Sequence, residues 1–362
     1  MIINGRTVTS MSETLGVAFV GGLIFFILHI PLAWMLGPLA AVMVWKLLTK
    51  RQLYWPVQFR NAGLMVLGYI LGTSFTLETL EQITHQLPSM LLVTVLTILF
   101  SFLMGFIVSK AANIDLVSGL IGSVPGGLSQ MIVLGEELQG VDTTVVTFMQ
   151  TFRLLAVIFI VPFLIGNGIT PVVATDESVH EVVSPSIHSN MYFLFFITVI
   201  LSARLGRKLS LPTAPLLGPL IGTASLLLLG LTAPKVPSFI VITAQLLVGS
   251  YMGLIMNPTS LSNWKRLAPF TTGASVALVL FSLGLGWLLT VLHPMTLVSA
   301  FLGASPGGIA EMGVTAREVH AELSMVTAYQ MFRVFFILFA VPPFLKWWIN
   351  KMKKSYSTVE ND

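Results

Sequence analysis

The sequence contains no cysteine and very few charged residues. Without cysteine, the chain has no disulfide framework, no thiolate metal ligand and no thiol nucleophile. Asp, Glu, Lys and Arg make up only 9% of its 362 residues, against about a quarter of an ordinary soluble domain. The 19 basic residues exceed the 15 acidic ones by four. Charge this sparse provides no basic face for nucleic-acid phosphates, so direct nucleic-acid binding is not expected.

Apolar residues dominate instead, at 55% of the chain with a mean hydropathy of +0.89. This composition predicts an all-α integral membrane protein, and apolar runs of about 20 residues or slightly fewer mark the spans. The first run has no signal-peptide cleavage pattern and is interpreted as a retained span. Ten runs are predicted to span, near residues 14–30, 34–48, 61–77, 88–109, 141–165, 190–204, 214–231, 238–256, 269–292 and 322–346. Two more, about 114–135 and 296–313, are interrupted by Gly and Pro.

The two halves of the chain resemble each other. At an offset of 181 residues the tetrapeptide LGPL is repeated, and so are several isolated proline and glycine positions. After a one-residue gap the offset becomes 180, and the segment Gln150–Arg153 falls on Gln330–Arg333. An ordered set of matches at nearly constant offset predicts an internal duplication, with membrane repeats at 1–181 and 182–362. Their interrupted segments are predicted at 114–139 and 296–320.

The basic residues predict the orientation of these repeats, because cytoplasmic loops collect Lys and Arg. If both interrupted stretches return to the side they enter from, 15 basic residues are cytoplasmic, and only Lys235 and Arg317 are external. If both stretches cross, the split worsens to 11 inside and six outside. Five spans per half make the second repeat an inverted copy, with both termini cytoplasmic. A crossing broken helix combined with one miscounted span near 14–48 would also give five spans.

The interruptions read SVPGGLSQM and ASPGGIAEM. Proline ends a helix, paired glycines allow unusual dihedral angles, and a half-helix that begins beyond them presents free N–H groups to an anion. Inverted repeats with such breaks are typical of secondary transporters, although a packing kink is the simpler alternative. The candidate solute-binding residues of the breaks are Ser123, Pro125, Gly126, Gly127, Ser129, Gln130, Ser305, Pro306, Gly307, Gly308 and Glu311.

Arg153 and Arg333 are basic residues placed near the centre of predicted spans. An arginine there costs roughly 2.5–3.5 kcal/mol, so each is expected to face the protein interior. Gln150 and Gln330 precede them by three residues and extend a polar stripe on one helical face. These four residues could line a path for an anion, or they could satisfy carbonyls at the broken helices. Glu311 could carry a coupling proton or serve as the counter-ion of an arginine.

The paired motifs PLAWMLGPLA and PTAPLLGPLI, the PGG segments and the Q-x-F-R segments resemble the membrane AbrB family of duplicated bacterial inner-membrane proteins. The resemblance covers nearly the whole chain. This family is distinct from the small soluble DNA-binding regulator of the same name. It implies an inner-membrane location and a role in regulation of gene expression, and some members carry an ammonia monooxygenase label. It supplies no catalytic residues.

The monooxygenase label can be tested against the metal ligands that an oxygenase needs. The six histidines are scattered over span ends and loops, so no enzyme, metal or cofactor is expected. The favoured function is a secondary transporter or exporter of a small, anionic or amphipathic solute by alternating access. A membrane sensor that regulates gene expression indirectly is the alternative, and an oxygenase the remote one. The expected partners are the lipid bilayer and a small solute, and homo-oligomer formation is left open.

Overall fold

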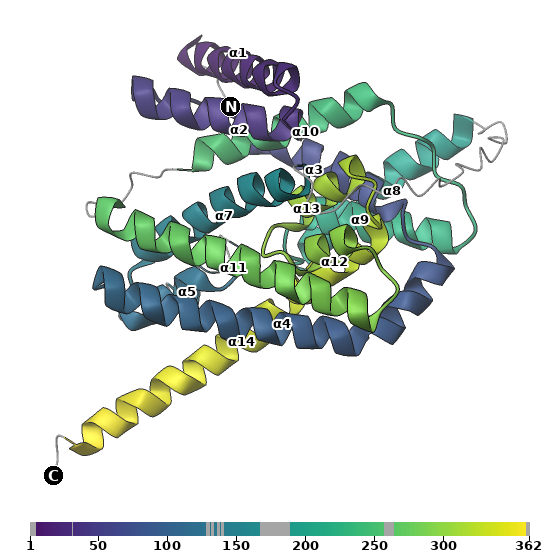
Figure 1. Cartoon of the computed structure of the whole chain (residues 1–362). Helices are drawn as coiled ribbons and strands as arrows, with labels where there is room; N and C mark the ends of the chain where they lie inside the picture. The colour runs from purple at the N-terminus through teal and green to yellow at the C-terminus, as the bar shows by residue number, and fades with distance from the viewer. Residues whose placement is uncertain are drawn as a thin grey trace. The chain divides into compact units, whose positions relative to one another are not determined.

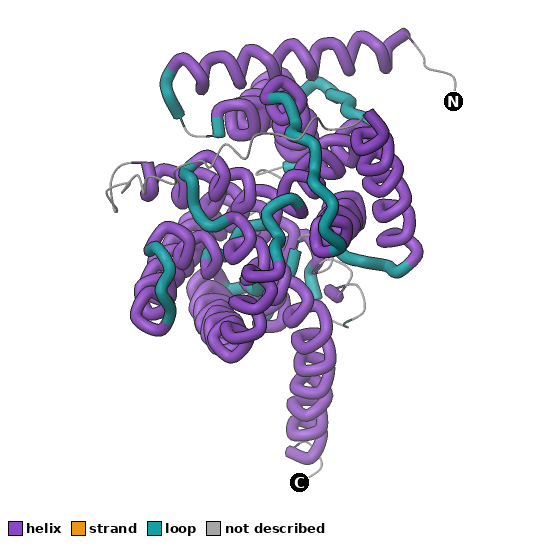
Figure 2. The backbone as a smooth tube through the Cα atoms, turned by 90° about the vertical axis from the view of Figure 1, so that its right-hand side faces the viewer, coloured by secondary structure: helices purple, strands orange, loops and turns teal. Residues whose placement is uncertain are grey.

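The computed structural model describes residues 5–30, 32–127, 131, 134–135, 138, 141–166, 189–256 and 264–359. Within these ranges the regular secondary structure is entirely helical (Figure 2), which confirms the predicted all-α class. The helices, labelled in Figure 1, are α1 (Gly5–Ile27), α2 (Ala33–Thr49), α3 (Val57–Gly72), α4 (Leu77–Ala112), α5 (Leu116–Ser123), α7 (Thr143–Gly166), α8 (Ser189–Lys208), α9 (Ala214–Leu228), α10 (Ser238–Ile255), α11 (Trp264–Leu292), α12 (Leu297–Ala304), α13 (Ile309–Glu318) and α14 (Leu323–Val359).

Each of the ten predicted runs coincides with a helix. By length and composition, six described helices could cross a membrane: α1, α4, α7, α10, α11 and α14. The apolar helices α2 and α9 are shorter. Large apolar side chains such as Phe193, Phe196 and Trp287 are more than 60% exposed. Outward-facing apolar surface on this scale suits a lipid environment, so the chain is an all-helical membrane protein.

The chain forms two compact units, and each unit draws on both sequence halves. Unit 1 comprises residues 1–85, 161–257 and 310–327, whereas unit 2 comprises residues 86–160, 258–309 and 328–362. The helices α1, α2, α3, α8, α9 and α10 belong to unit 1, as does α13 from its second residue onward. The helices α5, α11 and α12 and most of α4, α7 and α14 belong to unit 2.

In unit 1, matching glycines bring matching helices into close contact. The α2 helix packs against α10, and α3 packs against α9. A methyl group added to Gly68 would lie closer than 3.0 Å to the Leu216 carbonyl oxygen, and one added to Gly249 would meet the Met35 carbonyl oxygen equally closely. Gly68 and Leu216 become Gly249 and Met35 when the two halves are exchanged at the offset of 181.

The relative direction of α3 and α10 in unit 1 follows from which of their residues are in contact. Along α3 and α10, Gly63 lies against Val248 whereas Ile70 packs with Val241, so these two helices run antiparallel. Gly63 also lies against Ala244, its own equivalent at the offset of 181.

The turns before α2 and α9 have the same unusual backbone. His29 and Leu32 have φ angles of 53° and 54°, and Ser210 and Thr213 have φ angles of 54° and 45°. Positive φ is uncommon outside glycine, and both pairs are related by the offset of 181. A local sequence therefore folds in the same way in each half.

Unit 2 contains α5 and α12, the first helices of the two interrupted segments, together with α11 and most of the long helix α4 (labelled in Figure 1). The rings of Phe100 on α4 and Phe281 on α11 stack with centroids 4.1 Å apart, and these residues are again equivalents at the offset of 181. Ser89 on α4 and His293, the residue that follows α11, are hydrogen-bonded at 2.7 Å. Around the first break, Ile121, Val124 and Ile337 form a fully buried apolar core.

Candidate functional site

The first interrupted segment begins with the short helix α5. The carboxylate of Asp115 accepts a hydrogen bond from the Ser118 N–H at 2.8 Å and caps the start of the helix. The helix ends at Val124, whose backbone is extended, because the following Pro125 disfavours the helical conformation of the residue before it. The eight residues of α5 cover about 12 Å at 1.5 Å per residue.

The two ends of the first interrupted segment are in contact. The N–H of Asp142, one residue before α7, donates to the Ser118 Oγ in the first turn of α5 at 2.8 Å. The two ends of this segment therefore lie side by side in unit 2. A re-entrant hairpin, one of the two possibilities that the sequence left open, would bring its ends together in this way.

The second segment has the same local design. The Thr296 Oγ1 caps α12 by accepting a hydrogen bond from the Ser299 N–H at 3.2 Å. The helix ends at Ser305, which is extended before Pro306. A new helix, α13, begins at Ile309 directly after the glycine pair, as the sequence predicts. The two caps and both helix ends are equivalent at the offset of 181.

Gln150 and Arg153 on α7 bind the carbonyls that α5 leaves free at its end. The Gln150 Nε2 donates to the Ile121 and Val124 oxygens at 3.0 and 2.9 Å, and the Arg153 Nη1 donates to the Val124 oxygen at 2.7 Å. A cation and a hydrogen-bond donor are stabilising at this position, because the C-terminal end of a helix carries partial negative charge. Only 7% of Arg153 is exposed.

Gln330 and Arg333 on α14 repeat this arrangement at the end of α12. The Gln330 Nε2 donates to the Leu302 and Ser305 oxygens at 2.7 and 3.0 Å. Arg333 donates to the carbonyl of Ser305, to that of Gly307 at 2.6 Å, and to the Gln330 Oε1. Both arginines thus hold broken helix ends together, which was the structural alternative for them.

These hydrogen bonds do not use every buried polar atom near the breaks. Among the described residues, the Nε atoms of both arginines, the Gln150 Oε1 and the Thr271 Oγ1 are buried without a hydrogen-bond partner. Buried polar atoms are normally satisfied by protein or by water. An unsatisfied guanidinium N–H beside a helix break can therefore receive a water molecule or an anion.

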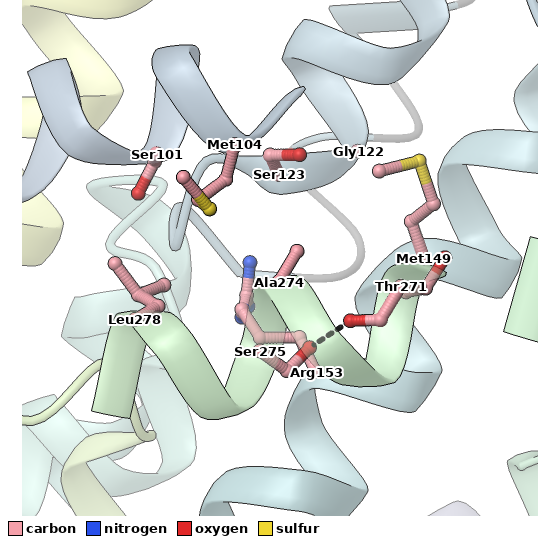
Figure 3. A pocket seen from close by; sticks show the side chains of 10 residues that line it. All are labelled: Ser101, Met104, Gly122, Ser123, Met149, Arg153, Thr271, Ala274, Ser275 and Leu278. Atoms are coloured by element: carbon pink, nitrogen blue, oxygen red, sulfur yellow. Dashed lines mark hydrogen bonds between the residues drawn. The ribbon is translucent and has the colours of Figure 1, made fainter. Parts of the chain in front are cut away.

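A cavity of about 20 Å³ lies beside Arg153 (Figure 3). Its polar lining consists of Arg153, Ser101, Ser123, Thr271 and Ser275, and its apolar lining includes Met104, Met149 and Leu278. The lining comes from four helices, α4, α5, α7 and α11. A space of this volume holds about one water molecule. The cavity is thus too small for an organic solute in the conformation seen here.

The glycines of the breaks serve different purposes. Gly127 has a φ of 90°, which only glycine adopts readily. Gly126 is buried, and an added methyl group would lie 2.7 Å from the Ile337 side chain. Pro125 and Pro306 are buried, whereas Gly307 and Gly308 are partly exposed. The Ser123 and Ser305 hydroxyls bond to the Gly119 and Phe301 carbonyls of their own helices.

The remaining predicted site residues lie elsewhere. Glu311 is buried in the first turn of α13, where a carboxylate suits the positive end of the helix. It belongs to unit 1, whereas both arginines belong to unit 2. Ser129 and Gln130 lie outside the described residues.

Some residues of the Arg153 cavity were not predicted from the sequence. Thr271 and Ser275 on α11 face it, as does Ser101 on α4. A regular four-residue spacing of small, mostly hydroxyl-bearing residues could have indicated them, because it marks one helical face. That spacing runs through Thr97, Ser101, Gly105 and Ser109.

The described part of the chain brings no three His, Asp or Glu side chains together as a candidate metal site. The fold and the site thus define a class: a multi-helix membrane protein with two Gly/Pro helix breaks, each bound by a buried Gln–Arg pair.

Sequence comparison supplies the family. Residues 34–349 match the model described as AbrB, "Transition state regulatory protein AbrB", and the chain belongs to this family. It is 26% identical over 351 residues to the "Uncharacterized protein YhjN" of Bacillus subtilis (strain 168), covering 92% of this chain and 91% of the relative. It is also 26% identical over 322 residues to the "Putative regulator AbrB" of Escherichia coli (strain K12), covering 88% and 90%. No solved structure matches it.

Proposed function

We propose that this protein is a secondary transporter of a small anionic solute that works by alternating access in the bacterial inner membrane. The main support for this proposal is the pair of buried arginines that bind two equivalent helix breaks. Fixed positive charge at mid-membrane is costly, and membrane proteins keep it at pathways and binding sites. Broken helices that meet near the midplane are the usual solute sites of transporters built from repeats.

The duplication behind this proposal is supported by matching geometry. Equivalent contacts are related by almost the same sequence offset. This holds for the Gly68–Leu216 and Gly249–Met35 contacts and for the two Gln–Arg pairs. Gly63–Ala244 in unit 1 and Phe100–Phe281 in unit 2 are contacts between equivalent residues, which occur beside a local twofold axis within each unit. Two copies related by such an axis explain both kinds of contact.

Inversion of the copies is supported by helix direction. The helices α3 and α10 are equivalent in sequence and antiparallel in unit 1. Equivalent spans that run in opposite directions across one bilayer require opposite topologies. This agrees with the 15-to-2 distribution of basic residues, which places the second repeat upside down relative to the first.

Hydrogen bonds in unit 1 agree with the predicted sidedness. The Lys46 Nζ donates to the Leu254 carbonyl at 2.8 Å, and both residues lie at predicted cytoplasmic ends. At predicted external ends, the Leu32 N–H donates to the Glu318 Oε2 at 3.0 Å. Each bond joins span ends that the basic residues assign to the same face. We therefore assign both termini to the cytoplasm.

We further propose that the first interrupted segment is a re-entrant hairpin, whose depth fits a solute site. Its α5 arm covers about 12 Å, close to half of the roughly 30 Å hydrocarbon core. Irregular backbone at that depth is tolerated where it is buried or lines a cavity, and the tip is bordered by the Arg153 cavity. The cavity must enlarge to admit a solute, which is the conformational step of alternating access.

A direct flux assay tests this proposal. Purified protein in liposomes should accelerate the uptake of at least one radiolabelled anion from a panel of acetate, lactate, succinate and inorganic phosphate. Protein-free liposomes set the background rate. Uptake at that background rate for every anion in the panel would refute transport of such anions.

A regulatory membrane protein is the second candidate, because the matching family model and the Escherichia coli relative are both described as regulators. In this case the cytoplasmic loops would dock a partner. Affinity capture from membranes would recover a stable cytosolic partner, and the liposomes would show no solute movement. The family names assign no enzymatic activity, and an oxygenase remains the remote alternative.

A further inference from the structure

We infer that unit 1 carries a second binding site, for a molecule that combines an anionic group with an apolar body. The site is a cavity of about 870 Å³ between the end of α3, the loop from α9 to α10 and the end of α13. Its anion-binding groups are Lys235 and Arg317. It is separate from the arginine sites at the helix breaks, which lie in unit 2.

The two cations that meet in this cavity are distinctive in the sequence. Lys235 and Arg317 are the two basic residues that are predicted to lie on the external face, and they come from different parts of the second repeat. The fold nevertheless brings both side chains to one cavity. Two of the few external charges gathered at one hollow provide a local positive field for an anion.

Neither cation is neutralised by a close ion pair in the described residues. The one ion pair within 4.0 Å there is Arg51–Glu13, on other elements. Glu78 lines the same cavity, but it lies beyond that distance from both cations. The lining therefore carries two positive charges against one negative charge, and its cations are free to bind an anionic group.

The rest of the lining suits an apolar body. Tyr69, Phe75, Leu231 and Val236 contribute apolar surface, and Thr73 and Thr232 contribute hydroxyls. The Tyr69 hydroxyl is already bonded to the Pro234 carbonyl, which fixes the loop that presents Lys235. A cavity with mostly apolar walls and a few convergent polar groups, within the usual range of about 300–1,000 Å³, is typical of organic-ligand sites.

Two sources could supply this chemistry: a soluble organic anion, such as an aromatic carboxylate, and the anionic headgroup of a membrane lipid. Both would place the charge between Lys235 and Arg317 and the apolar part against Phe75 and Leu231. The experiment below separates them.

The test measures binding without transport, so its failure leaves the transport proposal unaffected. The probe is 4-(trifluoromethyl)benzoate, observed by fluorine NMR with the full-length protein in phosphatidylcholine nanodiscs. We expect saturable binding at millimolar probe and at least tenfold weaker binding to Lys235→Gln/Arg317→Gln. The control Arg207→Gln/Lys208→Gln removes the same two charge types from exposed positions of unit 1 outside the cavity and should bind like the wild type.

The neutral analogue 4-(trifluoromethyl)benzamide should bind at least tenfold more weakly than the acid. Equal binding of acid and amide, equal loss in both double variants, or absence of saturable binding to the wild type would overturn the inference. A second set of nanodiscs contains phosphatidylglycerol. Weaker probe binding there, dependent on Lys235 and Arg317, identifies the lipid headgroup as the occupant. Unchanged binding identifies a soluble anion.

Discussion

Close packing at Gly68 and Gly249 gives a sharp stability prediction. A methyl group at either position would lie closer than 3.0 Å to a carbonyl oxygen of the facing helix. The helices would have to separate by roughly 1 Å to restore an ordinary contact. Overpacking of this kind costs about 1–3 kcal/mol. Alanine also recovers up to about 1 kcal/mol of helix propensity, so the net loss should be about 1–2 kcal/mol.

The matched control is Gly16→Ala on α1, because a methyl group there would meet no atom within 4 Å. This variant keeps only the propensity gain, so it should be about 1 kcal/mol more stable than the wild type. The difference between Gly68→Ala and Gly16→Ala is then about 2–3 kcal/mol. For a chain this large, that corresponds to roughly 3–4 °C in melting temperature.

The assay is thermal unfolding of the purified protein in detergent, followed by the fluorescence of its seven tryptophans. We expect Gly68→Ala and Gly249→Ala to lower the melting temperature by similar amounts, since their contacts are equivalent. If either variant were as stable as Gly16→Ala, the described helix contact would be wrong. If only one of the two were destabilised, the equivalence of the two interfaces would fail.

Three further predictions concern the breaks and the topology. Arg333→Gln should lower the free energy of unfolding by about 2–3 kcal/mol, because its guanidinium donates to three oxygens around the second break. The same melting assay checks this, and an effect no larger than that of the exposed Arg207→Gln would contradict it. Ser118→Ala should cost about 1 kcal/mol and raise hydrogen exchange in residues 116–127, because it removes the bond to the Asp142 N–H that joins the two ends of the first interrupted segment. Unchanged exchange would argue against the proposed re-entrant hairpin. Since the chain has no cysteine, single cysteine variants report on which side of the membrane a residue lies. Lys235→Cys should react with an impermeant maleimide in intact spheroplasts, whereas Lys265→Cys should react only after permeabilisation. The opposite pattern would reverse the topology.

The helices were predictable because the membrane imposes a simple rule on apolar run length. All ten predicted runs are helices, and Pro125 and Pro306 stop their helices as expected. The Gln–Arg pairs could be placed at the breaks because their spacing puts them on one helical face at the right depth. Whether they serve the fold or a solute could not be decided from spacing, since it does not show which carbonyls they bind.

The tertiary arrangement was less predictable. The two compact units interleave segments of both halves, because the long helices α4, α7 and α14 pass from one unit to the other. The meeting of Lys235 and Arg317 in one cavity depends on loop paths, which carry no periodic signal. Likewise, Thr271 reaches the Arg153 cavity only through the packing of α11 in unit 2.

The central claim is that the buried arginines at the helix breaks form the solute path, and flux through their variants tests it most directly. Liposomes containing Arg153→Gln or Arg333→Gln should lose at least tenfold in uptake of the anion that the wild type transports, whereas the exposed control Arg207→Gln should retain wild-type uptake. Arg153→Lys keeps the charge and should retain part of the flux. Wild-type flux in both glutamine variants would contradict the claim.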